Sequence, residues 1–457
     1  MGKNGFMRLG LKITAGVVGI LAAASYATGL TPAYVANAPT MLTGFGAMVA
    51  CSAKYVSGIN AKQNLSDIGS YSPLLANLEV TYDDSARRVE AGFLGLKTTS
   101  AQYREGLGCA LDIGDTTSLD RAKIPPMLAK SNALWPRGNT VHASGGVAQA
   151  LLEEILAADN DAGLQTRALL VAKGGQLVAE VYAPGFDHTS KLLGWSMAKS
   201  FNALMVGNME MRGLIDPAKK PVFAEWADDE RAHISLDDML HMASGLDLPE
   251  VYEPGEAVTE MLFTAHSGAD IGLAAGVVAD PGTHWGYSSG TSLLLSKLVY
   301  DRAGGTLDDT LADLSTHFIA PMGLTDFVLQ TDPSGVFLGS SFMLASARDW
   351  ARMGQVMLNG GTLNGHRIVT EDWVKRALTP NATTNKKAYG YQFWLNRGDS
   401  TPRWPGLPAD SYAALGSRDQ QVMIIPSKDT VIVRLGWSPD GKYPISKNFT
   451  QILAVGE

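Results

Sequence analysis

Two β-hairpins that lie far apart in the chain constrain its fold more than any other feature. The first is predicted over residues 168–183, where "ALLVA" and "QLVAEVYA" flank a Lys-Gly-Gly turn. The second is predicted over residues 420–436, where "QQVMII" and "TVIVRLG" flank the turn "PSKD". The chain between the hairpins has mostly helical patterns. Strands at both ends with helices between them predict an α+β protein with one sheet built from both chain ends.

The helices expected between the hairpins are marked by the residues that begin or end them. Ser235 suits a helix cap, Asp238 follows three residues later, and Gly245 suits the helix end. Residues 292–305 and 347–361 are two further expected helices, and each ends in a pair of glycines.

The N-terminal segment differs from the rest of the chain. Lys3, Arg8 and Lys12 precede an apolar stretch at residues 13–30, a pattern typical of a secretory signal or an uncleaved membrane anchor. The small-residue sequence "ANA" at residues 36–38 offers a cleavage site, and a buried helix of the fold is the alternative reading. We therefore expect an exported, periplasmic protein that an uncleaved segment would tether to the inner membrane.

Composition excludes several classes of function. The net charge of −8 and the lack of a basic cluster argue against a nucleic-acid partner. The eight histidines form no H-x-H or H-E-x-x-H pair, so we expect no metal site. Export would permit a disulfide between Cys51 and Cys109, and two free buried thiols are the alternative.

The stretch "GWSMAKSFNALMVG", residues 194–207, places Ser196 three residues before Lys199. Its apolar face and Gly213 predict a helix that starts at Ser196, so both residues share one face. A serine hydroxyl needs a base to become nucleophilic, and a buried, neutral lysine can be that base. The S-x-x-K tetrad is weak evidence alone, because about one occurs by chance in a chain of this length. A capping serine before an exposed lysine is the alternative.

Two further elements suit the same chemistry. Tyr287, in "PGTHWGYSSG", would relay a proton to a leaving group if it lay near Ser196, and a packed aromatic ring is the alternative. Gly416 and Ser417, in "ALGSRDQQVMIIP", lead into the second hairpin. An edge strand there would present a backbone N–H to an oxyanion, and a β-bulge is the alternative.

Together and in this order, these elements resemble the serine β-lactamase and penicillin-binding-protein superfamily. The resemblance covers about residues 140–450 and is closest to the class C-like branch with its esterases and 6-aminohexanoate-dimer hydrolases. "HMASGL", "SARDWARMGQVMLNGG" and "YGYQFWLN" extend it. It implies Ser196 as the acylated nucleophile, Lys199 as its base and Tyr287 as proton shuttle, without a cofactor. The implied fold is an antiparallel sheet flanked by helices plus a helical subdomain.

The resemblance and the composition divide the chain into a signal or anchor, an accessory region and a hydrolase domain. The expected bounds are 1–38, 39–130 and 131–457, the last with a sheet part at about 140–215 and 340–457 and a helical insert at about 216–339.

Departures from the superfamily pattern bear on the substrate. Ser289 stands where the Tyr-x-Asn motif has its asparagine, and residues 416–418 replace the K-T-G motif. We expect Ser196, Ser289, Gly416 and Ser417 to contact the substrate and its oxyanion. Arg418 would either bind a substrate carboxylate or be solvated. These changes favour a serine hydrolase acting on small ester or linear amide substrates.

Other functions stay open from sequence alone. A β-lactamase, a D,D-peptidase and a catalytically silent cell-envelope peptide-binding protein all fit the same fold. "GYSSG", residues 286–290, also matches the G-x-S-x-G nucleophile elbow with Ser288 as nucleophile. That elbow needs a preceding strand, which "ADPGTHW" does not favour.

Overall fold

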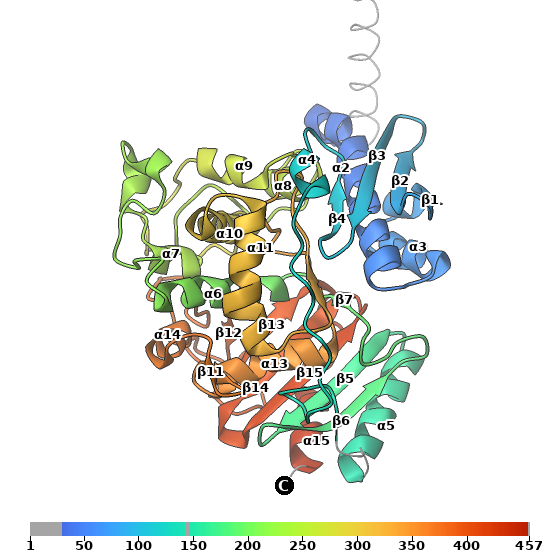
Figure 1. Cartoon of the computed structure of the whole chain (residues 1–457), viewed down its shortest axis with the longest axis vertical. Coiled ribbons are helices and arrows are strands. Elements are labelled where there is room, and N and C mark those ends of the chain that lie inside the picture. Colours follow the sequence, from blue (N-terminus) through green and yellow to red (C-terminus); the bar gives the residue numbers. More distant parts are fainter. Residues whose placement is uncertain (1–29, 142–145, 456–457) are drawn as a thin grey trace, which may run out of the picture.

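A six-stranded antiparallel sheet, in the order β12-β13-β14-β15-β5-β6, forms the centre of the computed structural model, which describes residues 30–141 and 146–455 (Figure 1). The strands are β5 (Thr166–Lys173), β6 (Gln176–Tyr182), β12 (Trp394–Leu395), β13 (Tyr412–Gly416), β14 (Gln420–Ile425) and β15 (Thr430–Gly436). The two predicted hairpins meet where β15 pairs with β5, with Val433 opposite Leu170. The α+β class and the sheet built from both chain ends are confirmed.

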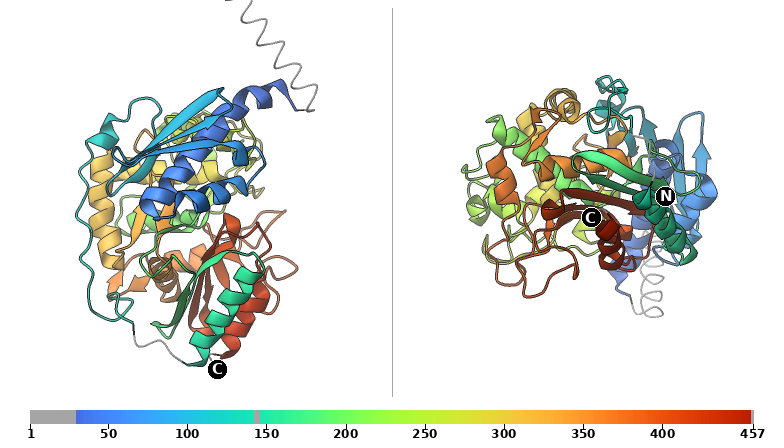
Figure 2. Two further views of the ribbon diagram at one scale, coloured as in Figure 1. Left: turned by 90° about the vertical axis from the view of Figure 1, so that its right-hand side faces the viewer. Right: turned by 90° about the horizontal axis from the view of Figure 1, so that it is seen from below.

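Helices cover both faces of this sheet, because successive side chains of a strand point to opposite sides. Leu170 and Val422 face α6 (Met197–Met211) and α13 (Ala347–Leu358), in the larger apolar core. Leu169 and Met423 face α5 (Val147–Asp161) and α15 (Ile445–Val455), which lie together on the outer face (Figure 2).

The middle of the chain forms a helical layer above the sheet. Its helices are α7 (Leu236–Leu240), α8 (Ala257–Phe263), α9 (Gly268–Ala274), α10 (Ser289–Ala303), α11 (Leu307–Leu314) and α12 (Ala320–Met322). Beside it are α14 (Glu371–Ala377), the small sheet of β7 (Leu192–Leu193), β9 (Met343–Ala345) and β8 (Phe327–Leu329), and the pair β10 (Thr362–Leu363) and β11 (His366–Arg367).

The expected helix at residues 235–245 is shorter than its pattern indicates. Ser235 and Asp238 form the predicted capping box, but the helix ends at Leu240. The side-chain amide of Gln392 donates to the carbonyl oxygens of Met239 and Leu240, at 3.3 and 3.2 Å, and so caps the helix from a distant part of the chain. The prediction that this helix ends at Gly245 was wrong, because Gln392, which caps the helix end, lies far away in the sequence.

The residues before the central sheet form a compact unit, which we call the accessory unit and define as residues 32–120. The sheet order is β1-β2-β3-β4, and α2 packs on β2 and β3. Its elements are α2 (Pro32–Cys51), α3 (Ala61–Gly69), β1 (Glu79–Asp83), β2 (Arg88–Phe93), β3 (Lys97–Arg104), β4 (Gly108–Leu111) and α4 (Thr117–Asp120).

The start of α2 does not coincide with the boundary expected at residue 38. The Thr31 side chain accepts a hydrogen bond from the Tyr34 N–H, and Pro32 occupies the first turn, so the helix begins there. The boundary and the "ANA" stretch both lie inside α2, whereas the apolar stretch from residue 13 to 29 lies outside the described residues. Within the described ranges, no helix is long and apolar enough to cross a membrane.

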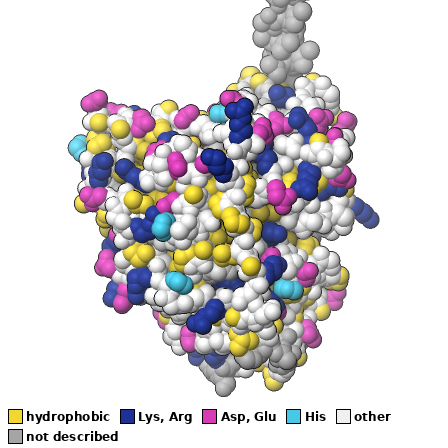
Figure 3. All heavy atoms as spheres, in the orientation of Figure 1, with side chains coloured by type: hydrophobic (Ala, Val, Ile, Leu, Met, Phe, Trp, Pro, Cys, Tyr) yellow, Lys and Arg dark blue, Asp and Glu magenta, His cyan; other side chains and the backbone are white. Residues whose placement is uncertain are grey.

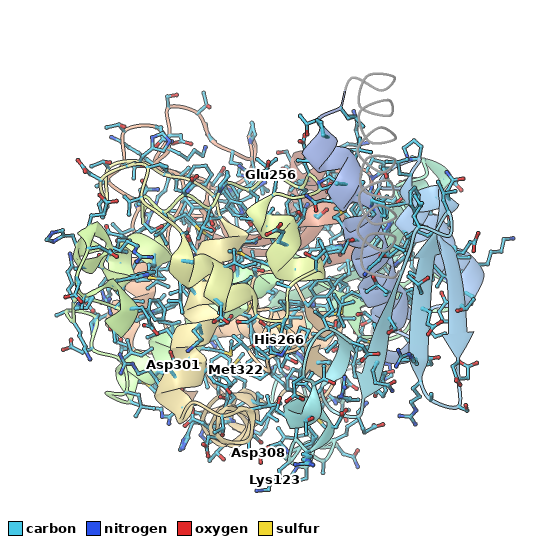
Figure 4. All side chains as sticks on the ribbon, turned by 90° about the horizontal axis from the view of Figure 1, so that it is seen from above. Lys123, Glu256, His266, Asp301, Asp308 and Met322 are labelled. Atoms are coloured by element: carbon cyan, nitrogen blue, oxygen red, sulfur yellow. A yellow bond between two sulfur atoms is a disulfide. The ribbon has the colours of Figure 1, made fainter. Side chains whose placement is uncertain are left out.

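Covalent and polar contacts hold the accessory unit together and join it to the helical layer. Cys51 and Cys109 form a disulfide that links the end of α2 to β4, with their Cα atoms 6.0 Å apart. In the segment directly after the unit, the Lys123 N–H donates to the carboxylate of Asp308 at 2.8 Å, and Figure 4 shows the two side by side. His266 bonds to the Asp115 carbonyl oxygen at 3.0 Å.

Loss of the disulfide should destabilise the protein. The bond closes a loop with a sequence separation of 58, and such bridges contribute about 2–4 kcal/mol to the free energy of unfolding. We expect the Cys51→Ser, Cys109→Ser variant to melt several degrees below the wild type in calorimetry. Reductant should lower the melting temperature of the wild type and leave that of the variant unchanged. Two freely alkylated thiols in the non-reduced, unfolded wild type would contradict the pairing.

Candidate active site

The N-terminus of α6 carries the predicted nucleophile at a sharp turn of the chain. The Gly194 N–H donates to the Met343 carbonyl oxygen at 2.9 Å, which fixes the approach from β7. Trp195 then adopts a left-handed conformation with φ of 48°, and the helix starts after Ser196. Position 194 must be glycine, because a Cβ there would lie 2.3 Å from the Trp350 ring.

Lys199 is buried directly beside the nucleophile. Its side chain is 1% exposed, and its Nζ lies 3.0 Å from Ser196 Oγ. The same Nζ contacts Ser289 Oγ at 2.9 Å and donates to the Ser340 carbonyl oxygen at 3.0 Å. Burial lowers the pKa of Lys199 to about 8, although the nearby Glu250 carboxylate raises it. Lys199 is thus poised to exchange a proton near neutral pH.

Tyr287 lies on the other side of the same ammonium group. Lys199 Nζ is 4.8 Å from the centroid of the Tyr287 ring, and the Ser196 hydroxyl lies close enough to the Tyr287 phenol to lower its pKa. Burial and the Glu250 charge raise the pKa of Tyr287, so the phenol holds its proton. The structure therefore brings together the three residues expected to carry catalysis.

Ser289 takes a different position from the one expected at the substrate. It is the first residue of α10, is fully buried, and does not line the cavity. Its hydroxyl lies between Lys199 Nζ and Glu250 Oε1, which accepts from it at 2.7 Å. Ser289 is thus placed to orient the ammonium and carboxylate groups rather than to touch a ligand.

Glu250 and Tyr252 are site residues that sequence reasoning missed. Glu250 Oε1 lies 3.9 Å from Lys199 Nζ, and its Oε2 accepts from the Ser289 N–H at 2.6 Å. The Tyr252 hydroxyl donates to Glu250 Oε1 at 2.8 Å. Both residues lie in an irregular loop, "LPEVYEPG", where no periodic pattern marks a function. The signal available was an acidic residue beside an aromatic residue in a loop.

Gly416 and Ser417 lie at the end of β13, where the strand lines the cavity. A Cβ on Gly416 would lie 2.0 Å from the Gly194 carbonyl oxygen, so only glycine permits this close approach to the start of α6. Strand β12 pairs with β13 only at Tyr412 and Ala413, so β13 is free of β12 beyond that point. This end of β13 has the edge character that the sequence predicted, although β13 itself is not the outermost strand.

Arg418 has neither of the positions considered from sequence. It is buried, and its guanidinium group lies 3.6 Å from the centroid of the Tyr71 ring in the accessory unit. Its backbone N–H donates to the Asp440 carboxylate. The Arg418 charge is therefore held against an aromatic ring.

Ser288 is not placed as a nucleophile elbow requires. Its hydroxyl caps α10 by accepting from the Thr291 N–H at 3.1 Å. Residues 280–288, all of them described, form turns and irregular structure rather than the strand that an elbow needs.

A cavity of about 1230 Å³ opens at Ser196. Its lining includes Tyr287, Glu250, Tyr252 and Arg403, with further residues from the accessory unit. Arg403 stacks over the Trp394 ring, with 4.1 Å from its guanidinium carbon to the ring centroid. The outer surface is mixed in charge: on the face in Figure 3, basic side chains are interspersed with acidic ones.

Comparisons with known proteins agree with this geometry. The beta-lactamase family model matches residues 85–449, so the chain belongs to the beta-lactamase family. A 6-aminohexanoate-dimer hydrolase of Paenarthrobacter ureafaciens is 28% identical over 292 residues, which cover 60% of this chain and 73% of that protein. Family and relative together support a serine hydrolase of this superfamily.

Solved structures share the fold at low sequence identity. A Bacillus anthracis protein, provisionally described as a 6-aminohexanoate-dimer hydrolase, has a TM-score of 0.57 at 19% identity, covering 74% of this chain and 91% of its own. A family VIII carboxylesterase has a TM-score of 0.54 at 14% identity, covering 70% and 100%. The antiparallel sheet flanked by helices is therefore the fold of this superfamily.

The charge of Glu250 should set the pH range in which Lys199 acts. Glu250→Gln removes the carboxylate that raises the Lys199 pKa, so burial should lower that pKa further below about 8. A base must be neutral, so the rise of kcat/KM with pH should move to lower pH. The measurement is the pH profile of p-nitrophenyl acetate hydrolysis. Glu253→Gln, at an exposed position of the same loop, is the control and should leave the profile unchanged. A shift to higher pH in Glu250→Gln would contradict this assignment.

Proposed function

We propose that this protein is a serine hydrolase that forms an acyl-enzyme at Ser196 with ester or linear amide substrates. One observation carries the proposal: a buried lysine with a lowered pKa lies 3.0 Å from the hydroxyl of Ser196. A lysine in that state can accept the serine proton, which makes the hydroxyl a nucleophile.

In the proposed reaction, neutral Lys199 takes the proton as Ser196 Oγ attacks the substrate carbonyl carbon. The oxyanion is stabilised by backbone N–H groups of Ser196 and of the Gly416–Ser417 turn. Tyr287 donates its proton to the leaving oxygen or nitrogen, and the Lys199 ammonium reprotonates it. In the second step, water attacks the ester carbonyl, and its proton returns through the same residues to Ser196 Oγ.

The position of charges in the site supports esters and linear amides over β-lactams. Arg418, in the segment where a K-T-G motif would stand, is buried against Tyr71 and is not among the residues that line the cavity. Ser289 has a hydroxyl in place of the asparagine amide, and its burial keeps that hydroxyl from a substrate carbonyl. A site without the K-T-G lysine and the asparagine amide gains little from binding the β-lactam groups that these two residues recognise. The names of the relatives, a 6-aminohexanoate-dimer hydrolase and a carboxylesterase, fit the same two substrate types.

Export to the periplasm, with the N-terminal segment as a signal or inner-membrane tether, is part of this proposal. The basic flank and apolar stretch at the N-terminus support it, and a disulfide between Cys51 and Cys109 suits an oxidising compartment.

A fluorophosphonate probe should label Ser196, because the probe reacts with an activated serine. Ser196→Ala should lose both labelling and turnover, whereas Ser288→Ala should keep both at reduced stability, since Ser288 caps α10. Peptide mapping by mass spectrometry identifies the labelled residue. Absence of labelling in a folded wild-type protein would favour the silent peptide-binding alternative.

Substrate order provides a second test of the proposal. We expect hydrolysis of p-nitrophenyl acetate and butyrate, hydrolysis of linear ω-amino amides, and at most trace turnover of nitrocefin. Initial rates give kcat/KM for each substrate under one condition. A kcat/KM for nitrocefin above that for both esters would replace this proposal with a β-lactamase.

A further inference from the structure

One face of α2, a helix of the accessory unit, forms a wall of the cavity at Ser196. The cavity-lining residues of this helix include Tyr34, Ala38, Met41 and Phe45. Spacings of three and four residues place side chains on the same face of a helix. Met48 and Val49, one turn further on, are fully covered in the core. The wall is therefore a continuous, mostly apolar helical face.

This wall begins next to the nucleophile. The Phe45 ring stacks nearly parallel to the ring of Trp195, with 6.2 Å between centroids and 8° between planes. Tyr71, which also belongs to the accessory unit, packs edge-on against Trp195 at 5.9 Å. Trp195 directly precedes Ser196, so the apolar wall is continuous with the reacting centre.

The dimensions of the wall suit a long, narrow ligand. From Phe45 back to Tyr34, the helix rises about 1.5 Å per residue, so this wall is roughly 16 Å long. The cavity of about 1230 Å³ exceeds the roughly 300–1,000 Å³ typical of small-ligand pockets. Leu74 and Leu75 line the same cavity from the segment that follows α3. A two-carbon or four-carbon acyl group would leave most of this apolar surface in contact with water.

We propose that the accessory unit binds a long unbranched hydrocarbon chain of the substrate, so that the favoured substrates are esters or amides carrying such a chain. This inference rests on the proposed function and names its substrate class. The Tyr, Met, Leu and Phe side chains that line the cavity contact the hydrocarbon chain along its length, while Ser196 and Tyr287 act at the polar end of the substrate.

The test measures how kcat/KM depends on chain length. Two series separate the sides of the scissile bond: p-nitrophenyl acetate, butyrate, octanoate and dodecanoate lengthen the acyl group, while butyl, octyl and dodecyl butyrate lengthen the leaving group. In the series whose hydrocarbon chain enters the cavity, kcat/KM should rise about fourfold for each methylene that becomes buried. A flat or falling dependence in both series, with butyrate still hydrolysed, would overturn the inference.

Two matched leucines of the accessory unit provide the variants. Leu74 is 41% exposed and lines the cavity, whereas Leu65 is 40% exposed on α3 and does not. In the series that shows the chain-length dependence, Leu74→Ser should lower the ratio of kcat/KM for the twelve-carbon substrate to that for the four-carbon substrate by about fivefold or more, and Leu65→Ser should leave this ratio unchanged. Met41→Gln, inside the cavity wall, should lower the ratio as well. Equal ratios in all three variants and the wild type would overturn the inference.

The two proposals fail in different ways. If no ester of any length is hydrolysed and Ser196 is not labelled by a fluorophosphonate, the proposed function fails. If Ser196 is labelled and short esters are cleaved without dependence on chain length, only the chain-binding role of the accessory unit fails.

Discussion

The burial of one ammonium group organises this protein. Removing the charge of Lys199 from water costs several kcal/mol unless polar partners compensate. Here, hydroxyl and carbonyl oxygens from α6, α10 and the segment before β9 surround Nζ, and the Glu250 carboxylate lies 3.9 Å away. Each partner comes from a different part of the chain, so the lysine environment exists only when the sheet, α6 and the helical layer are packed together. Because these partners compensate only in part for burial, the pKa of Lys199 stays low enough for the lysine to act as a base.

Close backbone approach is the second constraint, and it follows from the first. A buried lysine on α6 acts only if the start of that helix faces both a cavity and the end of β13. The absence of a side chain at Gly416 lets β13 approach the start of α6, and its absence at Gly194 leaves room for the Trp350 ring. The left-handed Trp195 turns the chain between β7 and α6. Packing thus fixes the serine at the one point where sheet, helix and cavity coincide.

Local signals explain what the sequence could predict. Both hairpins carry turn residues between apolar strands, and the capping box at Ser235 is complete within four residues, so these elements were foreseen. The serine, lysine and tyrosine were foreseen because their chemistry is recognisable in short motifs. Glu250 could not be foreseen, because its importance depends on contacts with Lys199 and Ser289 that an irregular loop creates. The role of α2 was also hidden: one face packs on the accessory sheet and another lines the cavity, so apolar residues surround the helix.

The position of α2 in the chain has an evolutionary consequence. The family model matches residues 85–449, whereas α2 spans Pro32–Cys51. Ser196, Lys199 and Tyr287 therefore lie within the part that the family model matches, whereas the cavity wall formed by α2 lies outside that part. Chemistry and selectivity can then diverge independently, by exchange of the wall around an unchanged reacting centre. A relative's name can therefore indicate the type of reaction, but it does not indicate the shape of the substrate that this protein binds.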